Sequence, residues 1–284
     1  MPDSLPSYSG LVDSSTQDNI LLMGKNGSNV DTMIFAHVDL TQQQITLLSL
    51  PRDLYYQDAK INAVYGQKGV LAQVAAVEDV LGYKVNHYAL IDMYAFKDVI
   101  DLLGGVAVTL DEDLIDPTYK VCDGDKCSTL YYPAGTYHLD GTEALRVARS
   151  RHTTSDYSRA ARQQLILDSL KRKAQSLGFG DAPTFLSIVN TVLGSLETDF
   201  KATDVLQDYF RYQNFTVDRG YVLSTGNVLS NLPVPVNYVT SRATTTCTNK
   251  ADPTTCTTSY ALDALQPKDG NWDAIKWYVR QLLQ

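Results

Sequence analysis

The chain has 284 residues, 44% of them hydrophobic, which is enough to bury one large core or two modest ones. Its net charge of −8 argues against general binding to nucleic acid, because such binding needs a basic surface. No apolar run reaches the roughly 18 residues that a transmembrane helix needs, so this sequence contains no membrane span.

Strand and helix patterns alternate along the chain. Short aliphatic runs predict buried strands in five segments: 19–23, 32–38, 44–50, 87–91 and 106–110. Apolar residues at helical spacing predict helices in six segments: 70–81, 93–103, 156–177, 183–196, 202–212 and 272–283. The alternation predicts the α/β class, with a single domain built on a central mixed β-sheet flanked by helices.

The four cysteines form two close pairs. Cys122 and Cys127 bracket a turn sequence, and Cys247 and Cys256 bracket a Thr-rich loop sequence. Locally paired loop cysteines predict two small disulfides and an oxidising compartment. The alternative is a zinc site with all four cysteines as ligands, although their spacings are wider than those of the usual C-x2-C knuckles.

Five of the eleven arginines lie between Arg146 and Arg162 in a protein that is otherwise acidic. A local cationic cluster attracts an anion that the overall field would repel. Planar guanidinium groups at close spacing suit a dense anion such as a phosphate or a pyrophosphate. The alternative is pairing with surface carboxylates, but Asp156 is the only carboxylate within the cluster, which favours an anion site.

Spacing indicates how these side chains gather. Arg159 and Gln163 are four residues apart near the start of a predicted helix, so they share a face close to its positive dipole end. Arg149 and Arg151 have strand-like spacing, so both can point the same way. Arg52 closely follows a predicted strand, and strand ends are where α/β proteins place ligands.

Some of the candidate residues also have simpler interpretations. Arg52 can form an ion pair with Asp53 or Asp31 instead of binding a ligand. Lys60, taken alone, is an ordinary loop lysine, and Gln163 without its arginine neighbours is a solvated helix residue.

Five short motifs occur in order along the chain: Asp31-Thr-Met, Leu50-Pro51-Arg52-Asp53, Lys60-Ile-Asn62-Ala-Val-Tyr65, Asp101-Leu-Leu-Gly-Gly-Val106, and Arg149-Ser-Arg151 followed by Asp156-Tyr-Ser-Arg159-Ala-Ala-Arg162-Gln163-Gln164. Together they resemble the LytR–CpsA–Psr family of bacterial cell-wall proteins. The resemblance covers about residues 19–173, and the closing segment from Pro267 to Trp272 also fits. One such motif would be weak, whereas five in this order make a strong match.

The resemblance implies a phosphotransferase of cell-wall assembly. Such an enzyme moves a glycopolymer from a polyprenyl-pyrophosphate carrier onto a peptidoglycan acceptor and holds the lipid tail in an apolar tunnel. It is extracytoplasmic, lies at the cell surface, and is anchored to the cell membrane by an N-terminal segment upstream of this sequence. The implied regions are a lead-in at 1–18, the catalytic domain at 19–243, a Cys- and Thr-rich loop at 244–258, and a C-terminal helix packed on the same domain at 259–284.

The resemblance also implies roles for individual residues. The catalytic residues would be Asp31, Arg52, Arg149 and Arg151. Contacts with the pyrophosphate and the lipid head group would come from Arg52, Lys60, Arg149, Arg151, Arg159, Arg162 and Gln163. Mg²⁺ on the pyrophosphate would take Asp31 as its protein ligand.

Two departures from the family pattern bear on the metal. The family usually has Gly-x-Asp after the first strand, where this chain has Gly24-Lys25-Asn26, and Arg-Ser-Asp where it has Asn29-Val30-Asp31. One expected carboxylate and one expected arginine are therefore missing. Asp31 alone would hold Mg²⁺ weakly unless phosphate oxygens and waters complete the octahedron, which leaves the need for magnesium open.

Two further functions stay open at this stage. A non-catalytic polyprenyl-phosphate-binding protein would keep the lipid pocket after loss of the metal site. A polyprenyl-pyrophosphate-glycan pyrophosphatase would release the glycan phosphate to water instead of to peptidoglycan.

Overall fold

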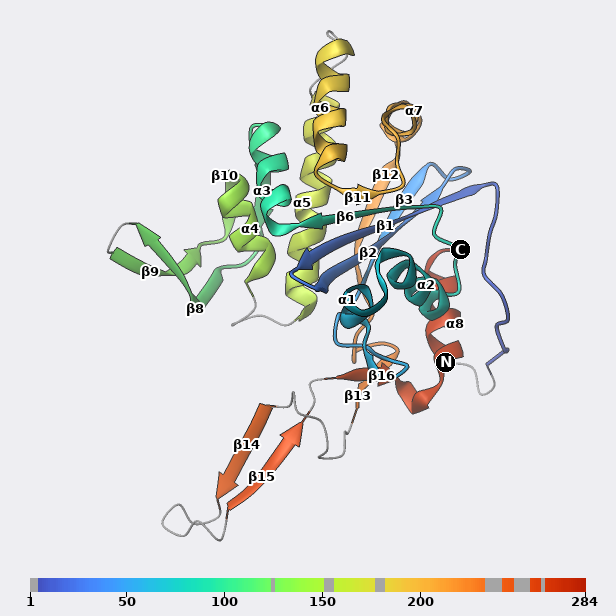
Figure 1. The fold of residues 1–284 in the computed structure, drawn as a ribbon, viewed down its shortest axis with the longest axis vertical. Helices are drawn as coiled ribbons and strands as arrows, with labels where there is room; N and C mark the ends of the chain where they lie inside the picture. Colours follow the sequence, from blue (N-terminus) through green and yellow to red (C-terminus); the bar gives the residue numbers. More distant parts are fainter. Residues whose placement is uncertain are drawn as a thin grey trace.

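The computed structural model describes residues 5–123, 126–150, 156–176, 182–232, 242–247, 256–261 and 264–284. A six-stranded mixed sheet, in the order β11-β6-β1-β2-β3-β12, forms its centre (Figure 1). These strands are β1 (Gln17–Asn26), β2 (Asn29–Asp39), β3 (Gln44–Leu50), β6 (His87–Asp92), β11 (Glu197–Thr198) and β12 (Thr216–Val222). Strands β1, β2 and β3 run antiparallel, whereas β6 runs parallel to β1 and β12 runs parallel to β3. The predicted mixed sheet is confirmed.

Helices flank this sheet on both sides (Figure 1). They are α1 (Val64–Lys68), α2 (Val70–Leu81), α3 (Met93–Leu102), α4 (Gly141–Arg149), α5 (Asp156–Ser176), α6 (Ala182–Gly194), α7 (Ala202–Tyr212) and α8 (Trp272–Leu282). Smaller strand pairs are β4 (Tyr55–Tyr56) with β5 (Ala59–Lys60), β7 (Val106–Leu110) with β10 (Gly135–Leu139), β8 (Leu114–Asp123) with β9 (Lys126–Tyr132), and β13 (Leu229–Asn231) with β16 (Leu265–Pro267). None of the helices in the described parts of the chain is long and apolar enough to cross a bilayer.

The two faces of the sheet bury different clusters because alternate residues of a strand point to opposite sides. On one face, Leu21 and Phe35 pack with residues of α2 and α8, including Val77 and Ile275. On the other face, Ile34, Ala36 and Leu47 pack against Leu167 of α5. A third cluster joins α3, α4 and α5 to the β7–β10 pair. The space between the sheet and these three helices therefore has an apolar lining.

Helix α4 is fixed to α3 by a glycine contact. A Cβ built on Gly141 would lie 2.2 Å from the carbonyl oxygen of Lys97, so only glycine allows this approach. The amide of Gly141 donates to Asp101 Oδ1 at 2.7 Å. Asp140 then caps the helix by accepting from the amide of Glu143 at 2.8 Å. These contacts set the position of the far end of α4, at Arg149.

The cysteine pairs lie in two hairpins. Cys122 and Cys127 form a disulfide across the β8–β9 hairpin, which confirms the first predicted bridge and excludes a four-cysteine zinc site. Cys247 and Cys256 occupy paired backbone positions in a hairpin of β14 (Arg242–Cys247) and β15 (Cys256–Ala261). The side chains of that hairpin lie outside the described residues, so the second disulfide stays a prediction. Part of the segment expected as a Thr-rich loop is thus strand, because β-branched threonine favours extended backbone.

His37 is buried in β2, and its ring has one hydrogen-bonding partner in the described part of the chain. Its Nδ1 lies 2.7 Å from Asn19 Oδ1, and because Asn19 Nδ2 donates to the carbonyl of Lys84, the histidine must be the donor in this pair. Within the described residues, its Nε2 is buried with no hydrogen-bond partner. Burial lowers the pKa of His37 from 6.5 to about 4. The folded protein therefore keeps a neutral imidazole at this position.

We predict that His37 makes the fold sensitive to acid. Between pH 6.5 and about 4, the unfolded chain binds a proton here that the folded chain does not. The free energy of unfolding should therefore fall as pH falls through this window, by up to about 1.4 kcal/mol per pH unit from this group. Denaturant unfolding at several pH values should show a shallower decline in His37→Gln than in wild type. Identical pH profiles for the two proteins would contradict this assignment.

Candidate active site

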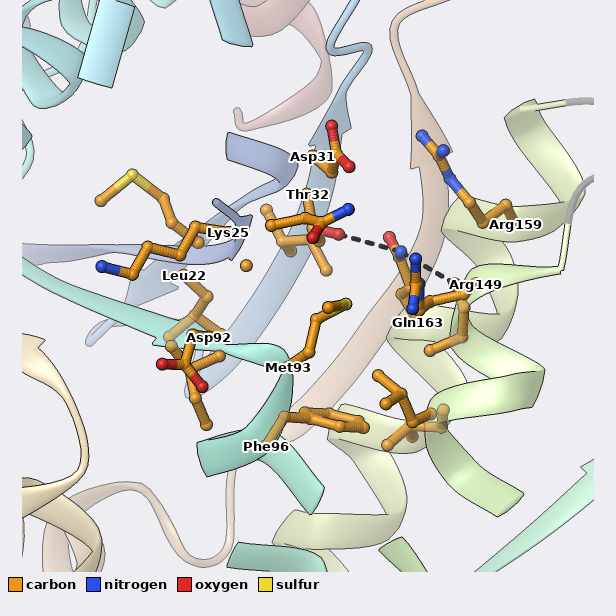
Figure 2. A pocket seen from close by; sticks show the side chains of 18 of the residues that line it. Leu22, Lys25, Asp31, Thr32, Asp92, Met93, Phe96, Arg149, Arg159 and Gln163 are labelled. Carbon is orange, nitrogen blue, oxygen red and sulfur yellow. Dashed lines mark hydrogen bonds between the residues drawn. The ribbon is translucent and has the colours of Figure 1, made fainter. Parts of the chain in front are cut away.

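A cavity of about 380 Å³ lies between the sheet and helices α3, α4 and α5. Its apolar lining comes from Leu22, Met23, Ile34, Ile91, Met93, Phe96, Leu145, Ala148, Ile166 and Leu167. Its polar lining comes from Lys25, Asn26, Asp31, Thr32, Arg52, Asp92, Arg149, Arg159 and Gln163. Figure 2 shows Asp31 and Arg159 toward one end and Phe96 toward the other. The cavity can therefore take a molecule that has an anionic part and an apolar part.

Arg52 sits between two carboxylates at the polar end of the cavity. Its Nη1 donates to Asp31 Oδ1 at 2.8 Å, and its Nε lies 3.6 Å from Asp53 Oδ2. The pair is half-buried, with 25% of the Arg52 side chain and 29% of the Asp31 side chain exposed. The ion pairs considered from the sequence are thus both present. They hold the guanidinium in place, since a paired arginine loses less freedom when it binds a second anion.

Lys60 does not reach the cavity. Its Nζ donates to Asp53 Oδ1 at 2.7 Å from the small β4–β5 hairpin. The expected contact between Lys60 and a head group stays a prediction. Lys60 forms an ion pair with Asp53, the carboxylate that also contacts Arg52 Nε.

Arg149 lines the cavity from the last residue of α4. Its side chain is exposed, and no carboxylate among the described residues pairs with it. The strand-like spacing expected for Arg149 and Arg151 is wrong for Arg149, because the capping box at Asp140 starts a helix that runs to this residue. Arg151 lies outside the described residues, as does the segment that joins α4 to α5. Arg149 is thus a cation available to an incoming phosphate.

Arg159 and Gln163 both line the cavity from α5, as their spacing predicted. Gln163 Nε2 donates to Thr32 Oγ1 at 2.9 Å and to the carbonyl of Ala148 at 3.1 Å, and Figure 2 shows this amide between β2 and α4. Gln163 therefore links three elements at the polar end of the cavity. Arg159 is only 7% exposed, so its charge is carried in the cavity wall.

Arg162 is turned away from the cavity. Its Nε donates to the carbonyl of Val147 at 3.0 Å, and its Nη2 donates to the carbonyl of Ser150. Burial, followed by the charge of Arg159, lowers the pKa of Arg162 to about 10, so it stays cationic at neutral pH. The expected contact of Arg162 with a head group stays a prediction. Arg162 binds the carbonyl end of α4, where a cation also complements the helix dipole.

Asp116 completes this buried polar cluster and was not foreseen from the sequence. It is 3% exposed, and its Oδ2 accepts from Ser150 Oγ at 2.9 Å. Its Oδ1 accepts from the hydroxyl of Thr118 at 2.8 Å and from the amide of Tyr119 at 3.1 Å. Asp116 thus ties the β8–β9 hairpin to the residue that ends α4.

Gln164 is a second residue that the sequence reasoning did not single out. Its fully buried Nε2 donates to Ser49 Oγ at 2.9 Å, and its Oε1 accepts from the amide of Gly220. The same Nε2 also contacts the carbonyls of Leu47 and Tyr221. The amide therefore joins α5 to both β3 and β12. The sequence pointed to Gln164 only through its place after Gln163 at the end of the fifth family motif.

Lys25 lines the cavity, but its ammonium group bonds a residue other than Asp31. Lys25 Nζ donates to Tyr65 Oη at 2.9 Å, and this hydrogen bond raises the pKa of Lys25, so its charge is directed to Tyr65 and not to Asp31. Within the described residues, no group of three metal-binding side chains occurs. Asp92, the other carboxylate in the cavity wall, caps α3 by accepting from the amides of Tyr94 and Ala95. Asp31 is thus the carboxylate best placed for a cation at the arginine end.

Comparisons with known proteins are consistent with this geometry. The chain matches the model of the LytR_cpsA_psr family over residues 7–230. It is 31% identical over 232 residues to the polyisoprenyl-teichoic acid–peptidoglycan teichoic acid transferase TagV of Bacillus subtilis (strain 168), covering 78% of this chain and 58% of the relative. It is 29% identical over 203 residues to TagT of the same strain, covering 66% of this chain and 62% of the relative. The chain thus spans about six-tenths of the length of these curated relatives.

Solved structures show the same fold. The crystal structure of B. subtilis TagV superposes with a TM-score of 0.66 at 24% identity, covering 95% of this chain and 98% of that one. A structure of TagT bound to LI-WTA gives a TM-score of 0.64 at 19% identity, covering 94% of this chain and 90% of that one.

We predict that removal of the Asp116 carboxylate lowers the free energy of unfolding. Asp116→Ala would leave the buried hydroxyl of Ser150 without its acceptor and would remove the acceptor of the Thr118 hydroxyl and of the Tyr119 amide. One unsatisfied buried group costs about 1–3 kcal/mol, so the free energy of unfolding should fall by about that amount in denaturant titrations. The control is Asp111→Ala, an exposed residue nearby, which should change it by less than about 0.5 kcal/mol. Equal effects of the two substitutions would argue against the cluster.

Proposed function

Because the chain belongs to the LytR–CpsA–Psr family, we propose that it is a phosphotransferase that moves a glycopolymer from a polyprenyl-pyrophosphate carrier onto peptidoglycan. One observation carries the proposal: a single cavity has arginines at one end and aliphatic and aromatic side chains at the other. The names of the relatives TagV and TagT state polyisoprenyl–teichoic acid transfer to peptidoglycan, and this supports the same substrate class here.

The cavity suits the two parts of such a donor. The pyrophosphate would lie against Arg52, Arg149 and Arg159, whose charges offset those on the phosphate oxygens. The first part of the polyprenyl chain would lie against apolar residues such as Ile34 and Phe96. Longer parts of the lipid would need an apolar tunnel that continues from this cavity, and that tunnel belongs to the proposal.

The reaction would proceed by direct attack of an acceptor hydroxyl. The hydroxyl oxygen bonds to the phosphorus that carries the glycan, and the bond from that phosphorus to the bridging oxygen breaks, so that the lipid phosphate leaves with the electron pair. Asp31, whose Oδ1 alone is occupied by Arg52, would either accept the hydroxyl proton or act through a bound metal ion. The arginines would act mainly on the transition state, where negative charge on the bridging oxygen increases.

Magnesium fits this site with a single protein carboxylate. Asp31 would hold the ion together with pyrophosphate oxygens and waters, a mode that Mg²⁺ commonly uses. The ion would neutralise phosphate charge. Asn26, which stands where the family usually has aspartate, also lines the cavity and weakens this site. We therefore propose that magnesium binds mainly with the substrate.

The proposal places the protein outside the cytoplasm, tethered to the cell membrane by an upstream N-terminal segment. The Cys122–Cys127 disulfide supports this location, because such bonds persist in oxidising compartments. A second candidate is a non-catalytic protein that binds polyprenyl phosphates. It is favoured by the missing carboxylate at Asn26, since a lipid pocket can remain after the metal ligands change.

We predict that Arg149→Ala loses transfer much more than lipid binding. Removing one donor to a developing oxyanion typically costs about 10²–10³ in rate, and Arg149 is exposed enough that its loss should not disturb the fold. The measurement is transfer of glycan phosphate from a polyprenyl-pyrophosphate donor, with donor binding followed in parallel. The control is Arg211→Ala on α7, which lines neither cavity described in this protein.

Two outcomes of that experiment would change the assignment. Wild-type transfer by Arg149→Ala would remove Arg149 from the catalytic group. If wild type and variant bind the donor equally and neither transfers, the binding-protein function replaces the transferase.

We further predict that Asn26→Asp increases the affinity for magnesium. The substitution adds a carboxylate to the cavity wall that contains Asp31, so the Mg²⁺ concentration for half-maximal transfer should fall by about tenfold. Asn29→Asp is the matched control, because Asn29 pairs with Asn26 across the same turn but does not line the cavity. Asp31→Asn should raise the magnesium requirement or abolish transfer. An unchanged magnesium titration in Asn26→Asp would show that no ion binds between these positions.

A further inference from the structure

A second cavity, of about 400 Å³, lies next to the first. The two cavities share four lining residues: Asp31, Thr32, Arg159 and Gln163. The second one extends from this shared wall between the ends of β2 and β3 and the segment 222–231 that joins β12 to β13. A molecule in either cavity therefore reaches the same carboxylate and the same guanidinium from a different side.

The two cavities differ in chemistry. Away from the shared wall, the second cavity has hydroxyl and amide groups from Ser49, Ser224, Thr225 and Asn231, and none of the described residues that line this part is charged. Most of its apolar residues are contributed by the sheet, the joining segment and Leu265 of β16, whereas α5 adds Ala160. Uncharged hydrogen-bonding groups over small apolar patches suit a neutral, hydroxyl-rich ligand, which is a saccharide.

The segment that closes the second cavity is held in one conformation by Asn227. Its Oδ1 accepts from the amides of Ser224 and Val228 at 2.8 and 2.7 Å, and its Nδ2 donates to the carbonyl of Val222 at 2.8 Å. These bonds satisfy the backbone of the turn and leave Thr225 and Gly226 exposed. A turn that is organised before the ligand arrives costs little ordering entropy on binding.

We propose that the second cavity is the acceptor subsite, which binds a sugar unit of peptidoglycan and presents its hydroxyl to the phosphorus. This inference rests on the proposed function. In phosphoryl transfer the attacking and leaving oxygens lie roughly in line, on opposite sides of the phosphorus. The leaving lipid phosphate remains with its tail in the first cavity, so the attacking hydroxyl arrives from across the shared wall. Asp31 lines both cavities and can take the proton of that hydroxyl.

The main competing occupant is the glycan of the donor itself. That sugar is attached to the attacked phosphorus, so its presence in the second cavity would make donor binding depend on the same residues. Acceptor binding and donor binding therefore have to be measured separately.

The test uses Thr225→Trp, which places a large side chain on an exposed turn at the cavity. Two measurements are made: binding of a soluble peptidoglycan fragment in the absence of donor, and binding of a polyprenyl-pyrophosphate donor. We expect the affinity for the fragment to fall by at least about tenfold and that for the donor to stay within about twofold. The matched control is Thr129→Trp on the exposed β9 strand, which lines neither cavity and should change neither affinity. Thermal unfolding checks that both variants are folded.

The outcomes separate this inference from the proposed function. Unchanged fragment binding in Thr225→Trp overturns the subsite, and wild-type transfer would then stand without it. A parallel loss of donor affinity also overturns it and assigns the cavity to the glycan of the donor. If wild type binds the fragment at this site but transfers nothing from the donor, the saccharide subsite stands and the transferase function fails.

Discussion

The buried amide of Gln164 holds α5 against the sheet, and the arrangement of the site depends on that contact. The amide reaches β3 and β12 at once, so α5 can neither slide nor rotate without leaving buried donors unsatisfied. The same placement brings Gln163 to Thr32 and sets Arg159 in the wall between two cavities. Gln164 lines neither cavity, yet its hydrogen bonds hold the helix that carries Arg159 and Gln163.

The arginines of this acidic chain divide into supporting and ligand-facing groups. Arg162 donates to a backbone carbonyl near the end of α4, and that bond positions the helix from which Arg149 extends. Arg52 is held by two carboxylates, and one of these is in turn neutralised by Lys60. The positive charge of Arg52 is therefore ordered in advance by negative charge around it. A guanidinium held in this way can bind a pyrophosphate without reorganising, which is the condition for electrostatic catalysis.

Some of this arrangement was accessible from the sequence and some was not. Four of the six strands of the central sheet and most of the helices follow from residue periodicity, and the spacing of Arg159 and Gln163 placed both on one face of α5. Arg162 looked equivalent to them, but its direction depends on where α4 ends, which is a tertiary property. Helix α4 was missed because it is only nine residues long, and its glycine start is explained only by the backbone of α3. The second cavity combines segments as far apart in the chain as Asp31 and Leu265, and no local pattern predicts such a meeting.

The wall shared by the two cavities also bears on the fidelity of the reaction. A carrier lipid seated in one cavity presents its phosphorus to whatever fills the other, and on the proposed assignment that is either a sugar hydroxyl or water. The same geometry would then give transferase activity when a sugar hydroxyl attacks and pyrophosphatase activity when water attacks. Loss of carrier to hydrolysis would be governed by how fully growing wall material occupies the neighbouring cavity, so the protein would couple the use of a scarce lipid to the supply of its acceptor.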